Sequence, residues 1–181
     1  WVTGADTVEG GSGDSGVMTA LGVFTGIRAS VERAFGSADL SGRHVAVQGI
    51  GKVGSRVAEL LAGEGAKLTV ADVDEGRAEA AAETLGADLV DPADIHAVDA
   101  DVFSPNALGG VLDDTTIPQL GCRVVAGAAN NQLAEPRHGA ELFRRGVLYA
   151  PDYVINAGGI IDVYHERIGF DRSALLKHIE G

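Results

Sequence analysis

The sequence predicts an α/β protein with a doubly wound, mostly parallel sheet and helices on both of its faces. Short apolar segments alternate with helical patterns along the 181 residues, and this alternation is typical of parallel sheets. A strand over 44–48 runs into a Gly-x-Gly-x-x-Gly turn and a helix, and a second strand over 67–72 ends in an acidic residue. Together these observations predict one Rossmann-like, dinucleotide-binding domain over residues 1–181.

The glycine-rich turn is the strongest functional signal in the chain. Its glycines, Gly49, Gly51 and Gly54, allow a tight turn, a close approach of the backbone to a pyrophosphate, and close packing of the next helix. That helix offers N–H groups and a positive dipole end to phosphates. Asp72 lies 18 residues after Gly54, near the roughly 20-residue offset of an acid that binds the adenosine ribose. We therefore expect NAD to bind in preference to NADP, with Arg77, the only nearby cation, pointing outward from its helix.

The first half of the chain is expected to open with a loop and then to alternate helices and strands. Apolar residues at 21, 24, 31 and 35 recur at helical spacing, and Gly36 is placed to end that helix. The elements expected here are a loop over 4–16, helices over 17–35, 53–63 and 74–85, a connection over 37–43, and strands over 44–48, 67–72 and 87–90.

The second half continues the same alternation. The elements expected here are a helical turn from 91, strands over 101–103, 123–126 and 147–150, helices over 114–120 and 135–145, and a helical tail from about 159. In a parallel sheet, ligands bind at the carboxyl ends of the strands. We therefore expect the loops 49–54, 104–110 and 127–131 to gather at one edge.

Composition and charge argue against several classes of function. The formal net charge of −12 argues against a DNA or RNA partner, because phosphate binding needs a basic face. No segment approaches the roughly 20 apolar residues of a membrane span, and no signal peptide is visible. The single Cys122 excludes an internal disulfide and indicates a reducing, cytoplasmic compartment. We interpret it as a small core residue rather than a nucleophile.

The remaining polar residues suggest one further site. The loop 127–131 carries Asn130 and Asn131, and an Asn amide can both donate to and accept from a carboxamide or a carboxylate. The two residues could equally cap the next turn, and both interpretations stay open. The five histidines lack metal spacing, and turns explain the aspartate pairs better than a metal does, so we expect no metal.

Several long motifs resemble a known family. The segments 149–159 (YAPDYVINAGG) and 126–133 (AGAANNQL), with Val2-Thr3-Gly4 at the start, are similar to the leucine, valine and phenylalanine dehydrogenase branch of the NAD-dependent amino-acid dehydrogenases, and to leucine dehydrogenase in particular. In that family an L-amino acid is reversibly deaminated to its 2-oxo acid while hydride passes to NAD. The resemblance therefore implies NAD as cofactor and a small-molecule substrate, an amino acid or its 2-oxo acid.

The resemblance also implies which residues line the sites. Carried over by position, the cofactor site comprises Thr19, Gly49, Ile50, Gly51, Lys52, Val53, Gly54, Ser55, Asp72, Val73, Ala107, Leu108, Ala128, Ala129 and Asn130. Asn130 would also touch the substrate carboxylate, and Ile160 and Val163 would line a side-chain pocket that suits a branched aliphatic substrate. Relatives often carry Cys where Asn106 stands, and leucine dehydrogenases can have Ala in place of Gly54. These departures blur the choice among leucine, valine and phenylalanine.

The family's catalytic lysines have no counterpart in this chain. The lysines and aspartate that perform its chemistry lie in a preceding N-terminal domain, whereas Lys52, Lys67 and Lys177 occur in other contexts here. Since the chain begins at Trp1, we expect a fragment that holds no catalytic residue and is inactive alone, cut from an enzyme that is itself a homo-oligomer. The alternatives are a stand-alone nucleotide-binding module without turnover, or another oxidoreductase such as a 2-hydroxy-acid dehydrogenase.

Overall fold

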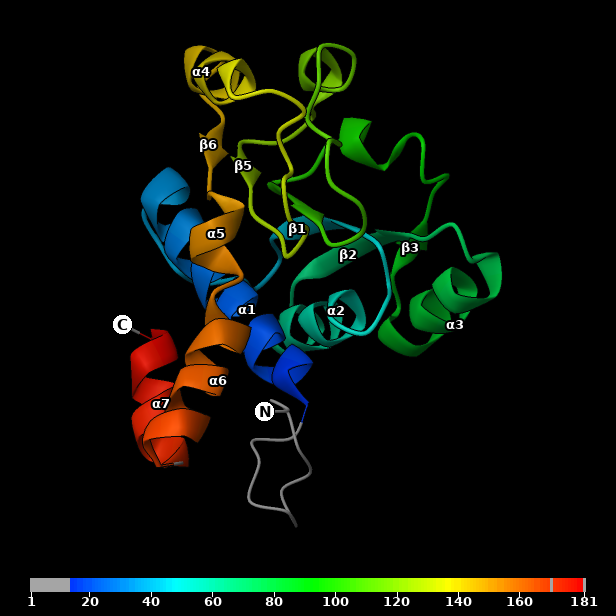
Figure 1. The fold of residues 1–181 in the computed structure, drawn as a ribbon. Coiled ribbons are helices and arrows are strands. Elements are labelled where there is room, and N and C mark those ends of the chain that lie inside the picture. The colour runs from blue at the N-terminus through cyan, green and yellow to red at the C-terminus, as the bar shows by residue number, and fades with distance from the viewer. Residues whose placement is uncertain (1–13, 170, 181) are drawn as a thin grey trace.

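The computed structural model describes residues 14–169 and 171–180 and contains one sheet (Figure 1). Within the described residues, six strands pair in the order β3-β2-β1-β4-β5-β6, and every neighbouring pair is parallel. The strands are β1 His44–Gln48, β2 Lys67–Ala71, β3 Asp88–Leu89, β4 Val102–Pro105, β5 Val124–Val125 and β6 Leu148–Tyr149. This is the doubly wound order in which the chain reverses direction across the sheet between β1 and β4.

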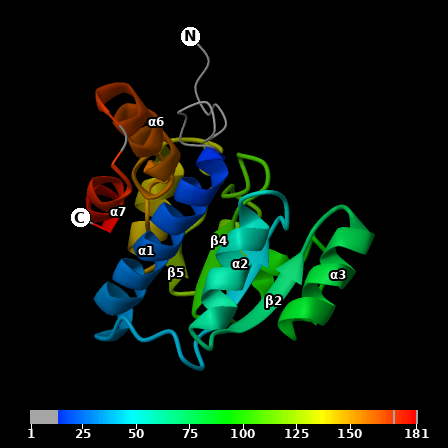
Figure 2. The same cartoon turned by 90° about the horizontal axis from the view of Figure 1, so that it is seen from below.

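One face of the sheet is covered by α1 Ser15–Phe35, α2 Gly54–Gly63 and α3 Glu75–Leu85. Figure 2 shows these three helices side by side in front of the strands. The helix α2 lies between the other two and contacts both α1 and α3. Val45 and Val47 of β1 join the apolar core on this side. Because side chains alternate along a strand, Ala46 between them belongs to the core on the opposite face.

The opposite face is covered by shorter elements. They are the 3-10 helices η2 Ile95–Ala97 and η3 Ile117–Gln119, together with α4 Arg137–Arg144. Ile95, Ile117 and Leu142 from these elements pack on Phe103 of β4, all of them almost fully buried. The prediction of helices on both faces is therefore confirmed.

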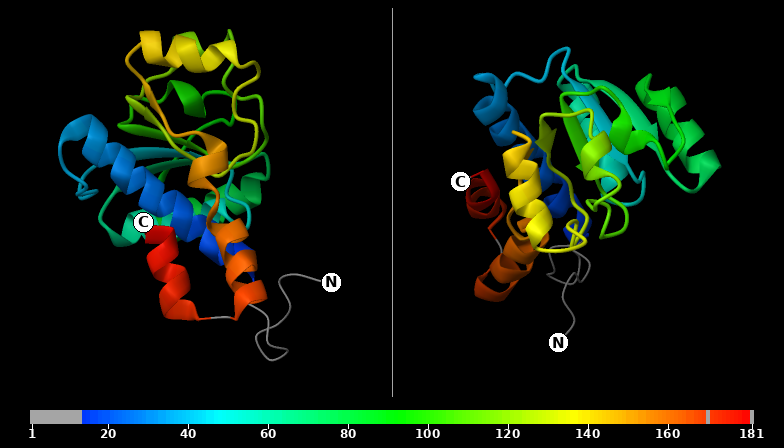
Figure 3. Two further views of the ribbon diagram at one scale, coloured as in Figure 1. Left: turned by 60° about the vertical axis from the view of Figure 1, so that its left-hand side comes forward. Right: turned by 90° about the horizontal axis from the view of Figure 1, so that it is seen from above.

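Three further helices complete the described chain: α5 Asp152–Ile155, α6 Gly158–Ile168 and α7 Arg172–Glu180. The left panel of Figure 3 shows α6 in orange and α7 in red beside α1 in blue, and both of them contact α1. None of the helices in the described residues combines the length and the apolar character that a membrane span requires.

Local signals explain where the first helices begin and end. The Asp14 side chain accepts a hydrogen bond from the Gly16 N–H and caps α1, while Asp74 caps α3 through the Arg77 N–H. Gly36 ends α1 and Gly86 ends α3, with φ of 81° and 64°. Glycine adopts this left-handed conformation without the strain that a side chain would cause, and it is therefore suited to end a helix. The predicted end of the helix at Gly36 is confirmed.

Most predicted elements are present, and the differences have local causes. The sheet is parallel at every pair rather than mostly parallel, and α1 begins at Ser15, two residues before the expected start. The helix expected over 114–120 is only the 3-10 turn η3, since the hydroxyl of Thr116 bonds the loop backbone at Val111. The tail is two helices, α6 and α7, separated after Gly169, whose φ is 105°. The expected loop over 4–16 lies mainly outside the described residues.

Candidate cofactor and substrate site

Three loops meet at the carboxyl edge of the sheet, as the sequence predicts. They follow β1, β4 and β5, which are neighbours in the sheet. A Cβ added to Gly49 would lie 2.8 Å from the Ala107 Cβ, so the glycine-rich turn touches the loop after β4. The N–H of Gly110 donates to the Asn131 carbonyl at 2.7 Å, which joins the loops after β4 and β5. The edge therefore forms one continuous surface at the point where the chain direction reverses.

The three glycines of the turn have different surroundings. Gly49 has a φ of 88°, a left-handed conformation that a side chain would strain. A Cβ on Gly54 would collide with the Gly49 carbonyl, so the turn and α2 pack as closely as they do only because that side chain is absent. Gly51, in contrast, has no neighbour within 4 Å of an added Cβ and faces open space. This open side is where a phosphate could approach the backbone.

The first turn of α2 has no side-chain cap among the described residues. Its N-cap, Val53, makes no side-chain capping bond among the described residues, whereas α1 and α3 beside it are capped by Asp14 and Asp74. The leading N–H groups of a helix need acceptors from outside the helix, and they carry the positive end of its dipole. Below the open face of Gly51, α2 thus presents donors that fit a pyrophosphate.

A cluster of charges holds the turn against α1. Asp14 accepts from Lys52 Nζ at 2.8 Å and from an Arg56 guanidinium nitrogen at 2.7 Å. The hydrogen bonds from Lys52 and Arg56 lower the pKa of Asp14 to about 2. Lys52, a predicted cofactor residue, therefore serves as a partner of Asp14 while its side chain stays 68% exposed.

Asp72 lies at the tip of β2, where the sequence places it. Its side chain is only 8% exposed, and its Oδ2 accepts from the Ile50 N–H at 2.7 Å while Oδ1 accepts from the Asp74 N–H at 2.9 Å. Arg77 is 51% exposed, as expected of a side chain that points outward, but it also contacts two carboxylates. Its Nη1 lies 3.8 Å from Asp72 Oδ1 and its Nη2 lies 3.4 Å from Asp74 Oδ2, because two neighbouring carboxylates attract the guanidinium.

The loop after β5 is held from inside by a buried amide. Gln132 is fully buried, and its Nε2 donates to the carbonyls of Gly127 and Ala129 at 2.8 and 3.0 Å. Asn106 supports the same loop from the β4 side: its Oδ1 accepts from the Ala128 N–H at 2.9 Å, and its Nδ2 donates to Ser104. The backbone of the loop 127–131 is thus fixed by side chains on both sides.

Asn130 is positioned by a second asparagine. The Nδ2 of Asn156 donates to Asn130 Oδ1 at 2.7 Å and to the Ala128 carbonyl at 3.2 Å. Since Oδ1 of Asn130 is the acceptor in this pair, its Nδ2 is turned away and can donate to a ligand. This is the orientation that binding a carboxylate or a carbonyl oxygen requires. The interpretation of Asn130 and Asn131 as simple caps explains neither contact.

The start of α6 brings the predicted substrate residues to the same region. A Cβ on Gly159 would lie 2.5 Å from Thr19 Oγ1, so α6 packs directly on α1 at Thr19. Ile160 follows on α6 with 78% exposure, and Val163 is half-buried. Val73 and Leu108 of the predicted cofactor site are 91% and 84% exposed. Val73, Leu108 and Ile160 are therefore exposed to solvent rather than packed in the core.

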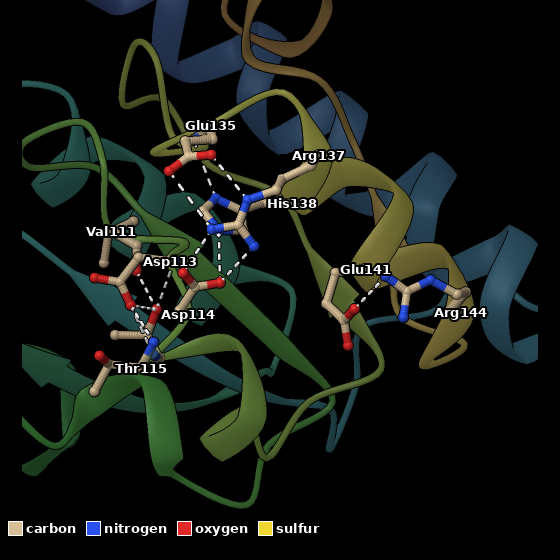
Figure 4. Close-up of polar contacts among 10 residues, drawn as sticks. Val111, Asp113, Asp114, Thr115, Glu135, Arg137, His138, Glu141 and Arg144 are labelled. Carbon is tan, nitrogen blue, oxygen red and sulfur yellow. Dashed lines mark hydrogen bonds and ion pairs between the residues drawn. The ribbon is translucent and has the colours of Figure 1, made fainter.

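A second polar cluster joins Asp114, in the loop before η3, to Arg137 and His138 of α4 (Figure 4). Arg137 makes two hydrogen bonds to the Asp114 carboxylate at 2.7 and 2.6 Å, and His138 adds a third at 3.2 Å. Those hydrogen bonds lower the pKa of Asp114 to about 2. His138 is buried, and its Nδ1 accepts from the Glu135 N–H. The cluster ties the loop before η3 to α4, and we interpret it as structural.

Sequence reasoning missed the residues that support the site. Gln132, Asn156 and Asp14 were not singled out, and Asn106 was noted only as a departure from relatives. Asn106 lies inside a predicted ligand loop and Gln132 directly follows one, and that proximity was the available signal for both. Asn156 lies in the motif 149–159, whereas the sequence offers no such signal for Asp14. Cys122, in contrast, is the buried core residue that was predicted, and burial raises the pKa of its thiol to about 11.

Comparison with known proteins places these features in a family. The Glutamate/Leucine/Phenylalanine/Valine dehydrogenase family matches residues 10–77 and 70–169. The leucine dehydrogenase of Thermoactinomyces intermedius is 47% identical over 181 residues, which is 100% of this chain and 50% of that protein. The phenylalanine dehydrogenase of the same organism is 48% identical over 173 residues, covering 94% of this chain and 47% of the relative.

A solved structure agrees with the sequence comparison. The L-tryptophan dehydrogenase of Nostoc punctiforme superposes with a TM-score of 0.90 at 46% identity, over 92% of this chain and 51% of that one. This chain therefore spans about half the length of the relatives it matches. The family match and the similarity to these dehydrogenases over nearly the whole chain show that the chain belongs to the Glutamate/Leucine/Phenylalanine/Valine dehydrogenase family.

Proposed function

We propose that this chain is the NAD-binding part of an amino-acid dehydrogenase that oxidatively deaminates a branched-chain L-amino acid, of the leucine or valine type, to its 2-oxo acid. The observation that carries the proposal is the pairing of the open face of Gly51 with the N-terminus of α2, which lacks a side-chain cap among the described residues. A dinucleotide pyrophosphate supplies the acceptors that this arrangement needs. The family resemblance supports NAD as this dinucleotide.

The remaining residues of the edge fit the same cofactor. Asp72 has two oxygens at the tip of β2, and each keeps accepting capacity beyond its one backbone bond. Ribose hydroxyls can use that capacity. The loop 127–131 lies on the other side of the point where the strand order reverses, where the nicotinamide end of a dinucleotide would reach. When bound, NAD supplies the hydride acceptor, and the protein orients the substrate toward it.

On the substrate side, the chain contributes recognition. Asn130, oriented by Asn156, donates its amide to the carboxylate of the amino acid. Ile160 and Val163 offer branched aliphatic surface for its side chain, and burial of such surface contributes about 25 cal/mol per Å². Aliphatic residues of this size favour leucine or valine over an aromatic substrate.

The groups that move protons are expected from another part of the protein. Of the three lysines in the sequence, Lys52 pairs with Asp14, Lys67 opens β2 at the edge opposite the site, and Lys177 lies on α7. A general base must reach the proton that it transfers before its pKa matters. None of these lysines is placed to deprotonate an ammonium group held at Asn130.

Cofactor binding is tested by Gly51→Val. The site has open space for the new side chain, so the variant should fold, yet the side chain would occupy the path of the pyrophosphate. Gly63→Val is the matched control, since Gly63 also faces open space but lies at the far end of α2. Calorimetry should show NAD binding by the parent chain and Gly63→Val, and none by Gly51→Val. Normal binding by a folded Gly51→Val would refute the site.

Turnover separates the enzyme hypothesis from the binding-module alternative. The isolated chain should reduce no NAD with leucine, valine or phenylalanine. The same chain joined to the upstream half of a full-length relative should regain activity, with aliphatic substrates ahead of aromatic ones. NAD binding without activity in the joined protein would favour a module that only binds nucleotide. Turnover by the isolated chain would show that the catalytic groups are within it.

A further inference from the structure

A second groove lies at the edge of the sheet opposite the glycine-rich turn. Its volume is about 660 Å³, and sites for small molecules typically measure roughly 300–1,000 Å³. The groove runs past β6, the last strand of the sheet, between the end of α1 and α4. Arg123 and Val147 of its lining directly precede β5 and β6, whereas the loops of the candidate cofactor site follow their strands. The groove is therefore separate from the surface proposed to bind the dinucleotide.

The charged residues that line this groove are both arginines. Arg33 lies in the last turn of α1, Arg123 directly precedes β5, and both side chains are exposed. Among the described residues, no carboxylate lines the groove and neither arginine forms an ion pair. Two like charges in one groove repel each other, and an anion bound between them would remove that repulsion. In a chain of net charge −12, this local excess of positive charge suits an anionic ligand.

Arg123 is fixed in position by contacts with the end of α1. Its Nη2 donates to the Ala34 carbonyl at 3.0 Å, and its guanidinium carbon lies 4.7 Å from the centre of the Phe35 ring. Arg43 also contacts this ring, at 4.3 Å, but its charge is paired with Asp101. A guanidinium carries five N–H donors, so Arg123 keeps donors for a ligand beyond its bond to Ala34. Because the group is already ordered, a ligand pays little entropy to fix it.

The helix α4 and the strand β6 give the same groove an apolar part. Phe143 of α4 is 83% exposed, and Leu148 and Tyr149 of β6 are half-buried. Aromatic rings bury a large apolar area when another ring packs on them. An arginine fork binds a carboxylate or a phosphate through two parallel hydrogen bonds. The lining therefore suits a ligand that has an aromatic body and an acidic end.

We propose that this groove binds a small organic anion: Arg33 and Arg123 hold its carboxylate or phosphate, and its aromatic body lies against Phe143 and Tyr149. The site goes beyond the proposed dehydrogenase function and does not depend on it, because no residue of the candidate cofactor site lines the groove.

The test is a titration of the isotope-labelled chain, followed residue by residue by NMR. Two probes, phenyl phosphate and phenylacetate, share an aromatic ring and differ in the anion, while benzyl alcohol carries the ring without a charge. At least one of the two anions should bind with a Kd below about 1 mM and shift the amide signals of Arg123, Leu148 and Tyr149. The tighter of the two identifies the preferred anion. Benzyl alcohol should bind at least tenfold more weakly.

Variants of single arginines locate the anion. Arg33→Ala and Arg123→Ala should each raise the Kd at least fivefold. Arg145→Ala is the matched control, because Arg145 is also exposed and donates to one backbone carbonyl, that of Pro118, at 3.0 Å, but does not line the groove. Its Kd should equal that of the parent chain. If Arg123→Ala does not fold, Arg33→Ala decides alone, since the Arg33 side chain forms no hydrogen bond or ion pair with the residues that the structure describes.

Three results would overturn the proposal. The first is an equal Kd for Arg33→Ala and Arg145→Ala, which would show that the arginine charge of the groove does not hold the anion. The second is equal binding of benzyl alcohol and the two anions. The third is a set of signal shifts confined to the carboxyl edge of the sheet, which would place the probes at the candidate cofactor and substrate site instead.

Discussion

Replacing Gln132 by alanine should loosen the loop that presents Asn130. Gln132 is fully buried, and its amide donates to the carbonyls of Gly127 and Ala129, so one side chain closes the inside of that loop. Its Oε1 accepts no bond from any residue in the described ranges. The Gln132 side chain therefore contributes through its two donated hydrogen bonds. Removing it leaves the carbonyls of Gly127 and Ala129 without this donor and creates a small cavity.

The expected cost follows from these contacts. Two hydrogen bonds contribute about 1 kcal/mol each, and one buried methylene contributes about 0.8 kcal/mol. Removal of the unpaired Oε1 offsets roughly 1 kcal/mol of this. The net loss should be about 2 kcal/mol in the free energy of unfolding. NAD should also bind more weakly, because Ala128 to Asn130 lose their fixed backbone.

Urea unfolding and calorimetry measure the two effects. Gln119→Ala is the matched control: it removes the same amide, but Gln119 is exposed and bonds only the Thr115 carbonyl. The control should cost less than about 0.5 kcal/mol and leave NAD binding unchanged. Gln132→Met restores volume without donors and should recover only the packing part of the loss. Equal stability of Gln132→Ala and Gln119→Ala would refute the account of the loop.

Three further predictions concern other groups. Because Lys52 and Arg56 hold the pKa of Asp14 near 2, its ion pairs stabilise the fold fully above the ordinary value of 3.8 and progressively less as the pH falls toward 2. Asp14→Asn should therefore flatten the stability between pH 6 and 2.5, measured by urea unfolding. Cys122, buried with its pKa near 11, should resist iodoacetamide at pH 8 until the protein is denatured, as mass spectrometry would show. Asn106→Ala should weaken NAD binding severalfold by calorimetry, since the Ala128 N–H loses its acceptor.

The sequence predicted the parts of the fold that depend on local pattern. Alternating apolar strands and helices, together with the glycine turn, determine a parallel sheet because such strands need crossover helices. Loops at the carboxyl edge then follow from topology without knowledge of any contact. That is why Gly49, Ala107 and Asn131 were correctly expected to lie together.

What the sequence could not predict depends on competition among side chains. Arg77 turns toward Asp72 because Asp74, which caps the same helix, adds a second carboxylate on that side. The break after Gly169 interrupts a tail whose composition alone suits one helix. The amide bonds of Gln132 and Asn156 join residues brought close by the crossing of strands and loops. Such pairings are decided by tertiary geometry, which no spacing rule encodes.

In the proposed enzyme, different residues of this chain would bind the cofactor and select the substrate. A leucine and a phenylalanine dehydrogenase from one organism are 47% and 48% identical to it over nearly its whole length. Overall similarity in this segment therefore does not distinguish an aliphatic from an aromatic substrate. In the proposed function, the glycine turn, Asp72 and the loop 127–131 would contact the cofactor, which both reactions would share. If Ile160 and Val163 line the substrate side-chain pocket as proposed, selectivity between the two kinds of substrate should depend on those positions and on the residues that face them.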